Sequence, residues 1–173
     1  MIKVGEKAPQ FTAESYINGE FKDVSLGEHK GKWVVLFFWP LDFTFICPTE
    51  IKGFAKREEE FKSLNAVVLG VSTDSVHSHK AWREKDLPEV KFPLISDMNH
   101  NISKDYGILM EDKGIALRAT FIIDPEGVLQ YAVVSNLNVG RSVEETIRVL
   151  KAFQTGELCP VEWEPGQETL GKA

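Results

Sequence analysis

The sequence contains 173 residues, about the size of one globular domain. Hydrophobic residues make up 43% and charged residues 27% of it, which is typical of a folded domain and excludes disordered, collagen-like and coiled-coil chains. The 26 acidic residues outnumber the 20 basic ones, so the formal net charge is -6. Because no excess of Lys and Arg is available to neutralise phosphates, we expect no nucleic-acid partner.

The small number of cysteines and the residues at the N-terminus predict the cellular compartment of the protein. Two cysteines are too few for the disulfide framework of a small secreted domain. Residues 1–7 contain no apolar core of a secretory signal, and the longest apolar run, residues 33–40, is far shorter than the ~20 residues of a membrane span. We therefore expect a cytoplasmic protein in a reducing environment, with no membrane partner.

Hydrophobic periodicity and turn residues predict the elements in chain order. Asn18-Gly19 lies between two strand-like runs and is a strong signal for a β-hairpin. The apolar run 33–39 lacks alternation, which is typical of a strand buried on both faces of a mostly parallel sheet. The other predicted elements are helices over 48–64, from 74 or 75 to 85 and from a capping box at Ser142 to 153, a helical turn at 102–106, and strands over 66–72, 92–95, 119–123 and 128–134.

This order of elements indicates an α/β fold. Strand–helix–strand, followed by paired strands and a last helix, is the arrangement of a thioredoxin-like sandwich, here with an N-terminal β-hairpin. Residues after 153 are rich in Gly and Pro and offer little apolar area to bury. We therefore predict one domain over 1–153 and a C-terminal arm over 154–173.

Cys47 lies between the buried strand and the first long helix. Ligands of open α/β sheets bind outside the carboxyl ends of the strands, and Pro48 suits the first position of a helix. Glu50 has the spacing of a capping-box acid that reaches back to the helix entrance. A cysteine at this position faces free N–H groups and the positive end of the helix dipole, which favours thiolate over thiol. The pattern therefore indicates a reactive thiol rather than an inert core cysteine.

Residues 40–50, PLDFTFICPTE, resemble the active-site motif of the typical two-cysteine peroxiredoxins, with its pattern P-x-x-x-T-x-x-C. Further blocks that resemble this family follow in order: STDS at 72–75, HKAW at 79–82, RATFIID at 118–124, VGRS at 139–142 and GELCP at 156–160. The similarity extends over essentially the whole chain and is greatest to the bacterial alkyl hydroperoxide reductase C type. It implies a thioredoxin-like peroxidase that reduces hydrogen peroxide and organic hydroperoxides.

The resemblance implies roles for three residues of the motif. Cys47 is expected to attack the O–O bond of a hydroperoxide and to become a sulfenic acid. Thr44 is expected to form a hydrogen bond in the site, and Pro40 to shield it.

Three charged residues are expected to support this cysteine. The residues alone leave two possibilities for Arg118, a solvated charge at a strand end or a partner of the thiolate, and the resemblance implies the second. Glu50 and Arg141 resemble residues that orient Arg118.

Cys159, in the predicted arm, resembles a resolving cysteine. The resemblance implies that it condenses with the Cys47 sulfenic acid to form a disulfide, and that its partner belongs to the other subunit of a homodimer. The spacing of the two cysteines leaves an intrachain bond open as well. A disulfide requires Cα atoms within about 7 Å, and we expect a cysteine at the start of a helix not to meet this distance in the resting fold. The resemblance implies that the first turn around Cys47 unwinds before the bond forms.

The family further implies a dithiol protein that reduces the disulfide, either thioredoxin or a flavoprotein reductase of the AhpF type, and homodimers that assemble into a decameric ring. No glycine-rich nucleotide or phosphate loop is present, so we expect no bound cofactor. His77 and His79 would diverge on a helix and are expected to be surface or packing residues, and we predict no metal site.

Two other functions are compatible with a chain of this class. A protein thiol–disulfide oxidoreductase is disfavoured because no C-x-x-C pair follows the first buried strand. A non-enzymatic, ring-forming holdase would require exposed apolar surface, and such a role is compatible with peroxidase activity in the same protein.

Overall fold

The computed structural model describes residues 2–172, which divide into two compact units. The first unit ends at Arg141 and the second begins at Ser142. The predicted boundary at 153/154 differs from this division, because the last helix groups with the C-terminal arm rather than with the sheet.

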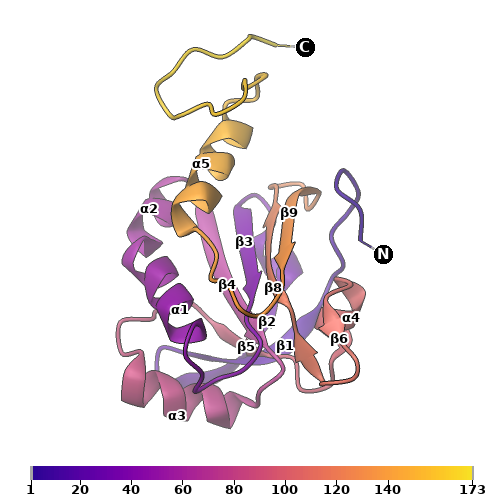
Figure 1. Ribbon diagram of the computed structural model, residues 1–173, viewed down its shortest axis with the longest axis vertical. Helices are drawn as coiled ribbons and strands as arrows, with labels where there is room; N and C mark the ends of the chain where they lie inside the picture. The colour runs from indigo at the N-terminus through magenta and orange to yellow at the C-terminus, as the bar shows by residue number, and fades with distance from the viewer. Residues whose placement is uncertain (1, 173) are drawn as a thin grey trace. The chain divides into compact units, whose positions relative to one another are not determined.

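A seven-stranded sheet forms the centre of the first unit (Figure 1). Its strands, in spatial order, are β2 (Glu20–Ser25), β1 (Thr12–Ile17), β5 (Leu94–Ser96), β4 (Ala66–Ser72), β3 (Trp33–Phe38), β8 (Arg118–Ile123) and β9 (Leu129–Ser135). The three strands β3, β4 and β5 are parallel, and every other neighbouring pair is antiparallel. The sheet is therefore mixed, and the prediction of a mostly parallel sheet is wrong. The turn at 124–127 is too short for a crossover, so β9 must return antiparallel to β8.

The N-terminal hairpin forms where the sequence predicts it. Asn18 and Gly19 both adopt positive φ angles, 51° and 88°, as a tight hairpin turn requires. Ile17 therefore pairs with Glu20, and β1 continues antiparallel to β5.

The central strand β3 is buried on both faces, as its unbroken apolar run predicts. Phe38 faces a core cluster on one side and lies 5.7 Å, between ring centroids, from Tyr106. Phe37 faces the other side, where its ring stacks on Phe54 at 4.2 Å. Aromatic pairs of this kind contribute about 0.5–1.5 kcal/mol beyond the burial of their area. Helices therefore cover both faces of the sheet at β3.

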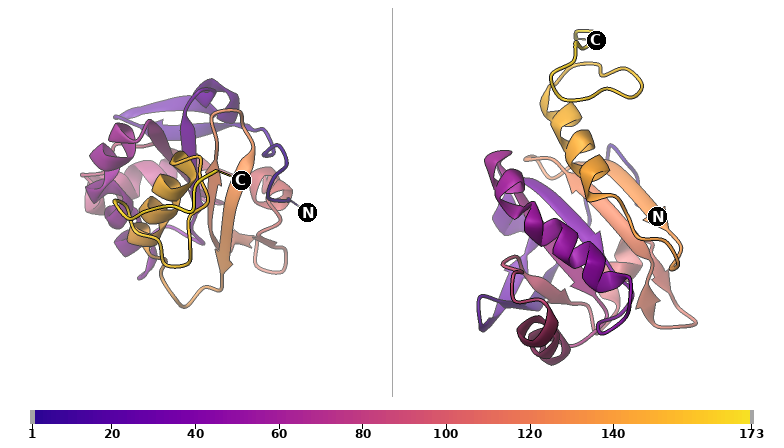
Figure 2. Two further views of the ribbon diagram at one scale, coloured as in Figure 1. Left: turned by 90° about the horizontal axis from the view of Figure 1, so that it is seen from above. Right: turned by 60° about the vertical axis from the view of Figure 1, so that its left-hand side comes forward.

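Three helices lie on the Phe54 side: α1 (Cys47–Lys56), α2 (Glu58–Ser63) and α3 (Val76–Asp86). Figure 2 shows α1 and α2 following each other along the sheet. The predicted continuous helix over 48–64 is interrupted at Arg57, whose backbone leaves the helical region at φ -106° and ψ 9°. Both Phe54 and Phe61 remain fully buried, so the periodicity that predicted one helix is satisfied by two. Ser75 begins α3 as predicted, and its hydroxyl accepts the Ser78 N–H.

The other face carries smaller elements. Helix α4 (Asn101–Asp105) contributes to the core cluster. The short strands β6 (Leu109–Met110) and β7 (Ile115–Ala116) pair with each other, and a 3-10 turn, η1 (Leu26–His29), precedes β3. The sequence does not predict the two-residue strands, which are too short to show a period.

The second unit consists of α5 (Val143–Gln154) and a chain segment that folds back on itself. The Ser142 hydroxyl accepts the N–H of Glu145, but the Glu145 carboxylate binds Arg148 instead of completing the capping box. Trp163 is buried and its carbonyl accepts from Arg148, so the arm does bury apolar area, contrary to expectation.

Neither α5 nor any other helix within residues 2–172 is long and apolar enough to cross a membrane.

Candidate active site

Cys47 begins helix α1, directly after the loop that leaves the end of β3. Its side chain is fully buried and its thiol is free. Pro48 follows at the start of the helix, as predicted, and no side chain caps the N-terminus at Ile46 in the described structure. The Thr49 and Glu50 N–H groups donate to the Ile46 carbonyl, so the helix acts on a negative charge at this cysteine through the positive end of its dipole.

Arg118 lies beside the sulfur. It is the first residue of β8, and β8 pairs with β3 so that Ala119 lies opposite Phe38 at the end of β3. One guanidinium nitrogen, Nη1, donates to Cys47 Sγ at 3.3 Å, while Nε donates to the Leu137 carbonyl at 2.8 Å. The side chain is 5% exposed, so this charge is a buried partner of the sulfur and not a solvated strand end.

Glu50 lies between two arginines instead of capping the helix. Its Oε2 accepts from Arg118 Nη1 at 2.6 Å, and its Oε1 accepts from Arg141 Nε at 2.8 Å. The expectation of a capping-box acid is therefore wrong. Charge-assisted hydrogen bonds to buried guanidinium groups are stronger than a hydrogen bond to a neutral backbone N–H.

Arg141 joins the end of β3 to this carboxylate. Its guanidinium donates to the Phe38 carbonyl at 2.5 Å and to the Ala119 carbonyl at 2.6 Å, in addition to both oxygens of Glu50. Burial lowers the pKa of Arg141, and the hydrogen bonds and charge of Glu50 act in the opposite direction. Arg141 therefore fixes Glu50, and through it Arg118, against two neighbouring strands.

The charges of this cluster balance only with an ionised sulfur. Arg118 and Arg141 carry two positive charges and Glu50 carries one negative charge, all on side chains that are at least 95% buried. A Cys47 thiol leaves one uncompensated positive charge in a low-dielectric environment, and a thiolate neutralises it. The cluster can therefore hold and orient a nucleophilic sulfur.

The remaining predicted residues of the motif lie in the loop between β3 and α1. Pro40 is buried. Thr44 is half-buried, and its hydroxyl donates to the Leu41 carbonyl at 3.0 Å. The Thr44 hydroxyl therefore has its partner within the loop itself.

A buried polar network beneath this loop is absent from the predictions. His79 is completely buried and its Nδ1 lies 2.8 Å from Asp42 Oδ2, so the expectation of a surface or packing histidine misses its polar role. The signal was present in the sequence, because Asp42 belongs to the active-site motif and His79 to one of the other similar blocks. Pattern analysis does not show that the two blocks meet.

Cys159 belongs to the second unit. Its Sγ lies 3.6 Å from Thr155 Oγ1 and 3.7 Å from the Ala152 carbonyl oxygen, and the residue is partly exposed. Its thiol is free, like that of Cys47. The residue therefore rests against the C-terminal end of α5 in the reduced state.

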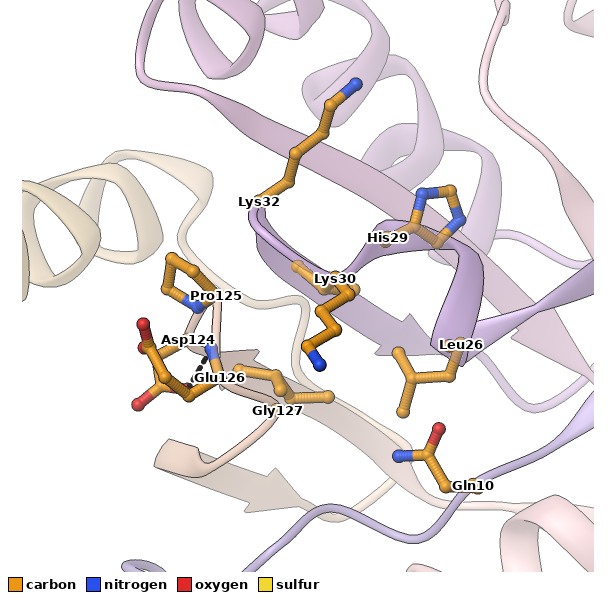
Figure 3. A pocket seen from close by; sticks show the side chains of 12 residues that line it. Gln10, Leu26, His29, Lys30, Lys32, Asp124, Pro125, Glu126 and Gly127 are labelled. Carbon is orange, nitrogen blue, oxygen red and sulfur yellow. Dashed lines mark hydrogen bonds between the residues drawn. The ribbon is translucent and has the colours of Figure 1, made fainter.

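A cavity of about 200 Å³ lies at the other end of the strands (Figure 3). It is lined by the loop around η1, including Lys30, and by the turn Asp124–Gly127. None of the candidate site residues, all of which the structure describes, belongs to its lining. Within residues 2–172, no group of three or more His, Cys, Asp or Glu side chains is arranged to hold a metal ion.

A mixed sheet covered by helices, with a buried cysteine at a helix N-terminus against an arginine, is the arrangement of an enzyme with a cysteine nucleophile. A family model described as the AhpC/TSA family matches residues 4–132. The chain is 53% identical over 175 residues to the putative peroxiredoxin YkuU of Bacillus subtilis. The aligned residues cover 96% of this chain and 97% of that protein.

Solved structures agree with this similarity. Reduced Plasmodium vivax 2-Cys peroxiredoxin is 39% identical, with a TM-score of 0.94 over 97% of this chain and 92% of that one. Enterococcus faecalis AhpC is 35% identical, with a TM-score of 0.88 over 92% of this chain and 100% of that one. The chain belongs to the AhpC/TSA family and is a peroxiredoxin, a thiol-dependent peroxidase with a thioredoxin-like fold.

Proposed function

We propose that Cys47 is the peroxidatic nucleophile of this peroxidase, and the observation that carries the proposal is the 3.3 Å hydrogen bond from Arg118 Nη1 to its buried Sγ. The thiolate attacks one oxygen of a hydroperoxide, the O–O bond breaks, and the sulfur is oxidised to a sulfenic acid. The departing alkoxide or hydroxide takes up a proton and leaves as an alcohol or water. The substrates are hydrogen peroxide and organic hydroperoxides.

The residues around the sulfur divide the work of this step. Arg118 stabilises the thiolate and the negative charge that develops on the departing oxygen. Glu50 and Arg141 hold Arg118 in place through their hydrogen bonds. Pro40 shields the sulfur from water, and Thr44 contributes a hydroxyl at the mouth of the site.

The test of this assignment is peroxide consumption by the reduced protein with dithiothreitol as electron donor. The wild type is expected to consume peroxide catalytically, and Cys47→Ser to consume none above background. Cys159→Ser is the matched control, because it keeps the nucleophile and should still reduce one equivalent of peroxide in its first turnover. Wild-type consumption by Cys47→Ser would refute the assignment.

For the second half of the reaction we propose Cys159 as the resolving cysteine. Its thiol sulfur attacks the Cys47 sulfenic acid, an S–S bond forms, and the S–OH oxygen leaves as water. Cys47 is fully buried in the reduced protein, so the turn at the start of α1 must open before another sulfur can reach it. We propose that the partner cysteine belongs to the second subunit of a homodimer, as the resemblance to the family implies.

Oxidation should therefore convert the protein to a covalent dimer. One equivalent of hydrogen peroxide is expected to shift the reduced wild type to dimer size on a non-reducing gel. Cys47→Ser and Cys159→Ser should each abolish the doubly bridged product. If oxidised wild type with no free thiols runs entirely as a monomer, the disulfide is intrachain and the intersubunit pairing is wrong.

The partners follow from the same chemistry. A thioredoxin-like dithiol protein reduces peroxiredoxin disulfides, and we propose that thioredoxin or an AhpF-type flavoprotein serves this chain in the cytoplasm, where both thiols can be regenerated. We further propose that homodimers assemble into a decameric ring. Apolar side chains in the loop before Cys47 support an assembly, since Phe45 is 93% and Phe43 50% exposed.

A further inference from the structure

A buried aspartate–histidine pair lies directly beneath the loop that delivers Cys47 and has no part in the chemistry described above. Asp42 lies in that loop, and its side chain is 1% exposed. His79 lies on α3 and is completely buried. Its Nδ1 lies 2.8 Å from Asp42 Oδ2, and its Nε2 lies 3.1 Å from the Ile95 carbonyl oxygen.

Asp42 connects the loop to three separate segments. Its Oδ1 accepts from the Trp39 indole N–H at 2.9 Å, at the end of β3. Its Oδ2 accepts from the Ser78 hydroxyl at 2.7 Å on α3, besides facing His79. Its backbone N–H donates to Asp74 Oδ2 at 3.0 Å, in the turn between β4 and α3. One loop residue is thus bonded through both carboxylate oxygens and its backbone.

The protons of the network can be assigned from its acceptors. The Ile95 carbonyl only accepts, so His79 Nε2 carries a hydrogen. One more proton must lie between Nδ1 and Asp42 Oδ2, which are 2.8 Å apart. Burial, and then the negative charge of Asp42, raise the pKa of Asp74. The proton shared by His79 and Asp42 lies beside these two acidic side chains.

The loop has few other attachments. Phe43, next to Asp42, has a left-handed φ of 56°, a strained conformation for a residue other than glycine. Phe45 is almost fully exposed, and Leu41 is 38% exposed. The Phe43 ring lies 5.7 Å from the Trp82 ring and Pro40 is buried, so apolar contacts hold the loop at these two residues. The polar network of Asp42 restrains the loop in addition to these apolar contacts.

We propose that Asp42 and His79 form a positioning pair that holds the loop Pro40–Ile46 in the conformation that presents Cys47 to Arg118. The proposal deepens the proposed function and rests on it, because it assumes that Cys47 reacts with hydroperoxide. Neither residue touches the sulfur. Breaking the pair should slow the oxidation of Cys47, because the sulfur is no longer held against its donor, and should speed disulfide formation, because the loop opens more readily.

The experiment measures these two steps separately in Asp42→Ala by stopped-flow kinetics with hydrogen peroxide. The second-order rate constant for Cys47 oxidation is expected to fall at least about tenfold, as for other misplaced reacting groups. The fraction of Cys47 converted to sulfinic acid at a fixed peroxide concentration, measured by mass spectrometry, is expected to fall as well. A general loss of stability would not produce faster resolution together with slower oxidation.

Two further variants test the hydrogen-bond geometry. Asp42→Asn is close to isosteric and can donate to a neutral His79 while accepting from Trp39, so it is expected to recover most of the lost rate. Ser78→Ala removes one hydrogen bond to Asp42 and is expected to shift both steps in the same direction as Asp42→Ala, by about two- to fivefold. This mild variant keeps the test valid if Asp42→Ala does not fold.

The matched control is Asp97→Ala. Asp97 is also a fully buried carboxylate, and it accepts three hydrogen bonds, from the Ile102 and Ser103 N–H groups and the Ser103 hydroxyl, so its carboxylate binds the start of α4 instead of the Cys47 loop. The Asp97→Ala variant should be less stable than wild type but should keep the wild-type rate constant for Cys47 oxidation. Wild-type kinetics in Asp42→Ala and Ser78→Ala, or an equal slowing in Asp97→Ala, would overturn the proposal. A wild-type protein that fails to react with peroxide would instead refute the proposed function.

Discussion

Replacing Arg118 with Ala is expected to slow the oxidation of Cys47 by hydrogen peroxide about 10²–10³-fold, the usual cost of losing one preorganised donor at a site of developing charge. The substitution removes the Nη1–H that donates to Cys47 Sγ at 3.3 Å. It also removes the positive charge that balances a thiolate inside the cluster. Both effects act on the same sulfur, so the rate constant for the first step should carry the full loss.

The fold should tolerate this change better than the reaction does. Glu50 remains paired with Arg141, which binds both of its oxygens. Arg118→Lys is the matched variant, because it keeps a positive charge but lacks the planar guanidinium, whose Nε donates to the Leu137 carbonyl while Nη1 donates to the sulfur and to Glu50. We expect it to recover only part of the rate. The measurement is stopped-flow oxidation at several peroxide concentrations, and an Arg118→Ala rate constant within about threefold of wild type would show that Arg118 has no role in this step.

The position of Cys47 could be predicted because it depends on neighbouring residues. A buried strand, a short loop and Pro48 at the start of a helix are all local patterns, and the structure confirms them. The meeting of Cys47 with Arg118 is not local, because 71 positions separate the two residues. It depends on β8 pairing with β3 in one register, and periodicity does not specify which strands become neighbours. The resemblance to a family supplied what the residue pattern lacked.

Errors in the predictions have the same physical origin. The spacing of Glu50 fits a capping box, but two buried guanidinium groups compete for the carboxylate and bind it more strongly. The Gly- and Pro-rich composition after residue 153 suggested a loose arm. A single tryptophan, Trp163, nevertheless provides enough apolar area to fold the segment back, and its carbonyl receives a hydrogen bond from Arg148 of α5. The overall composition of a segment does not reveal the contribution of one such buried residue.

The largest loss of stability is expected from Glu50→Ala. The substitution leaves Arg118 and Arg141 buried without the carboxylate that pairs with both of them, and an ionised Cys47 sulfur can neutralise only one of the two charges. Removing one partner of a buried ion pair costs about 3–5 kcal/mol, because the desolvated charge that remains is uncompensated. In a chain of this length each kcal/mol lowers the melting temperature by about 2–4 °C. The reduced protein should therefore melt about 6–20 °C below wild type at equal protein concentration.

Glu145→Ala is the matched control for burial. Glu145 also binds an arginine through two short hydrogen bonds, to Arg148 at 2.6 and 2.7 Å, but its side chain is 47% exposed. Exposed pairs of this kind contribute about 0–1 kcal/mol, so the melting temperature should fall by no more than a few degrees.

A second substitution tests the cause of the Glu50 effect. In Glu50→Ala/Arg141→Met one of the two uncompensated charges is gone, and the Met side chain occupies part of the vacated space. We expect the double variant to be more stable than the sum of the single effects, with a coupling free energy of about 0.5–3 kcal/mol. Strict additivity would mean that Glu50 stabilises the protein through its own packing rather than by neutralising the two arginines, and the charge balance inferred for the Cys47 cluster would then have to be abandoned.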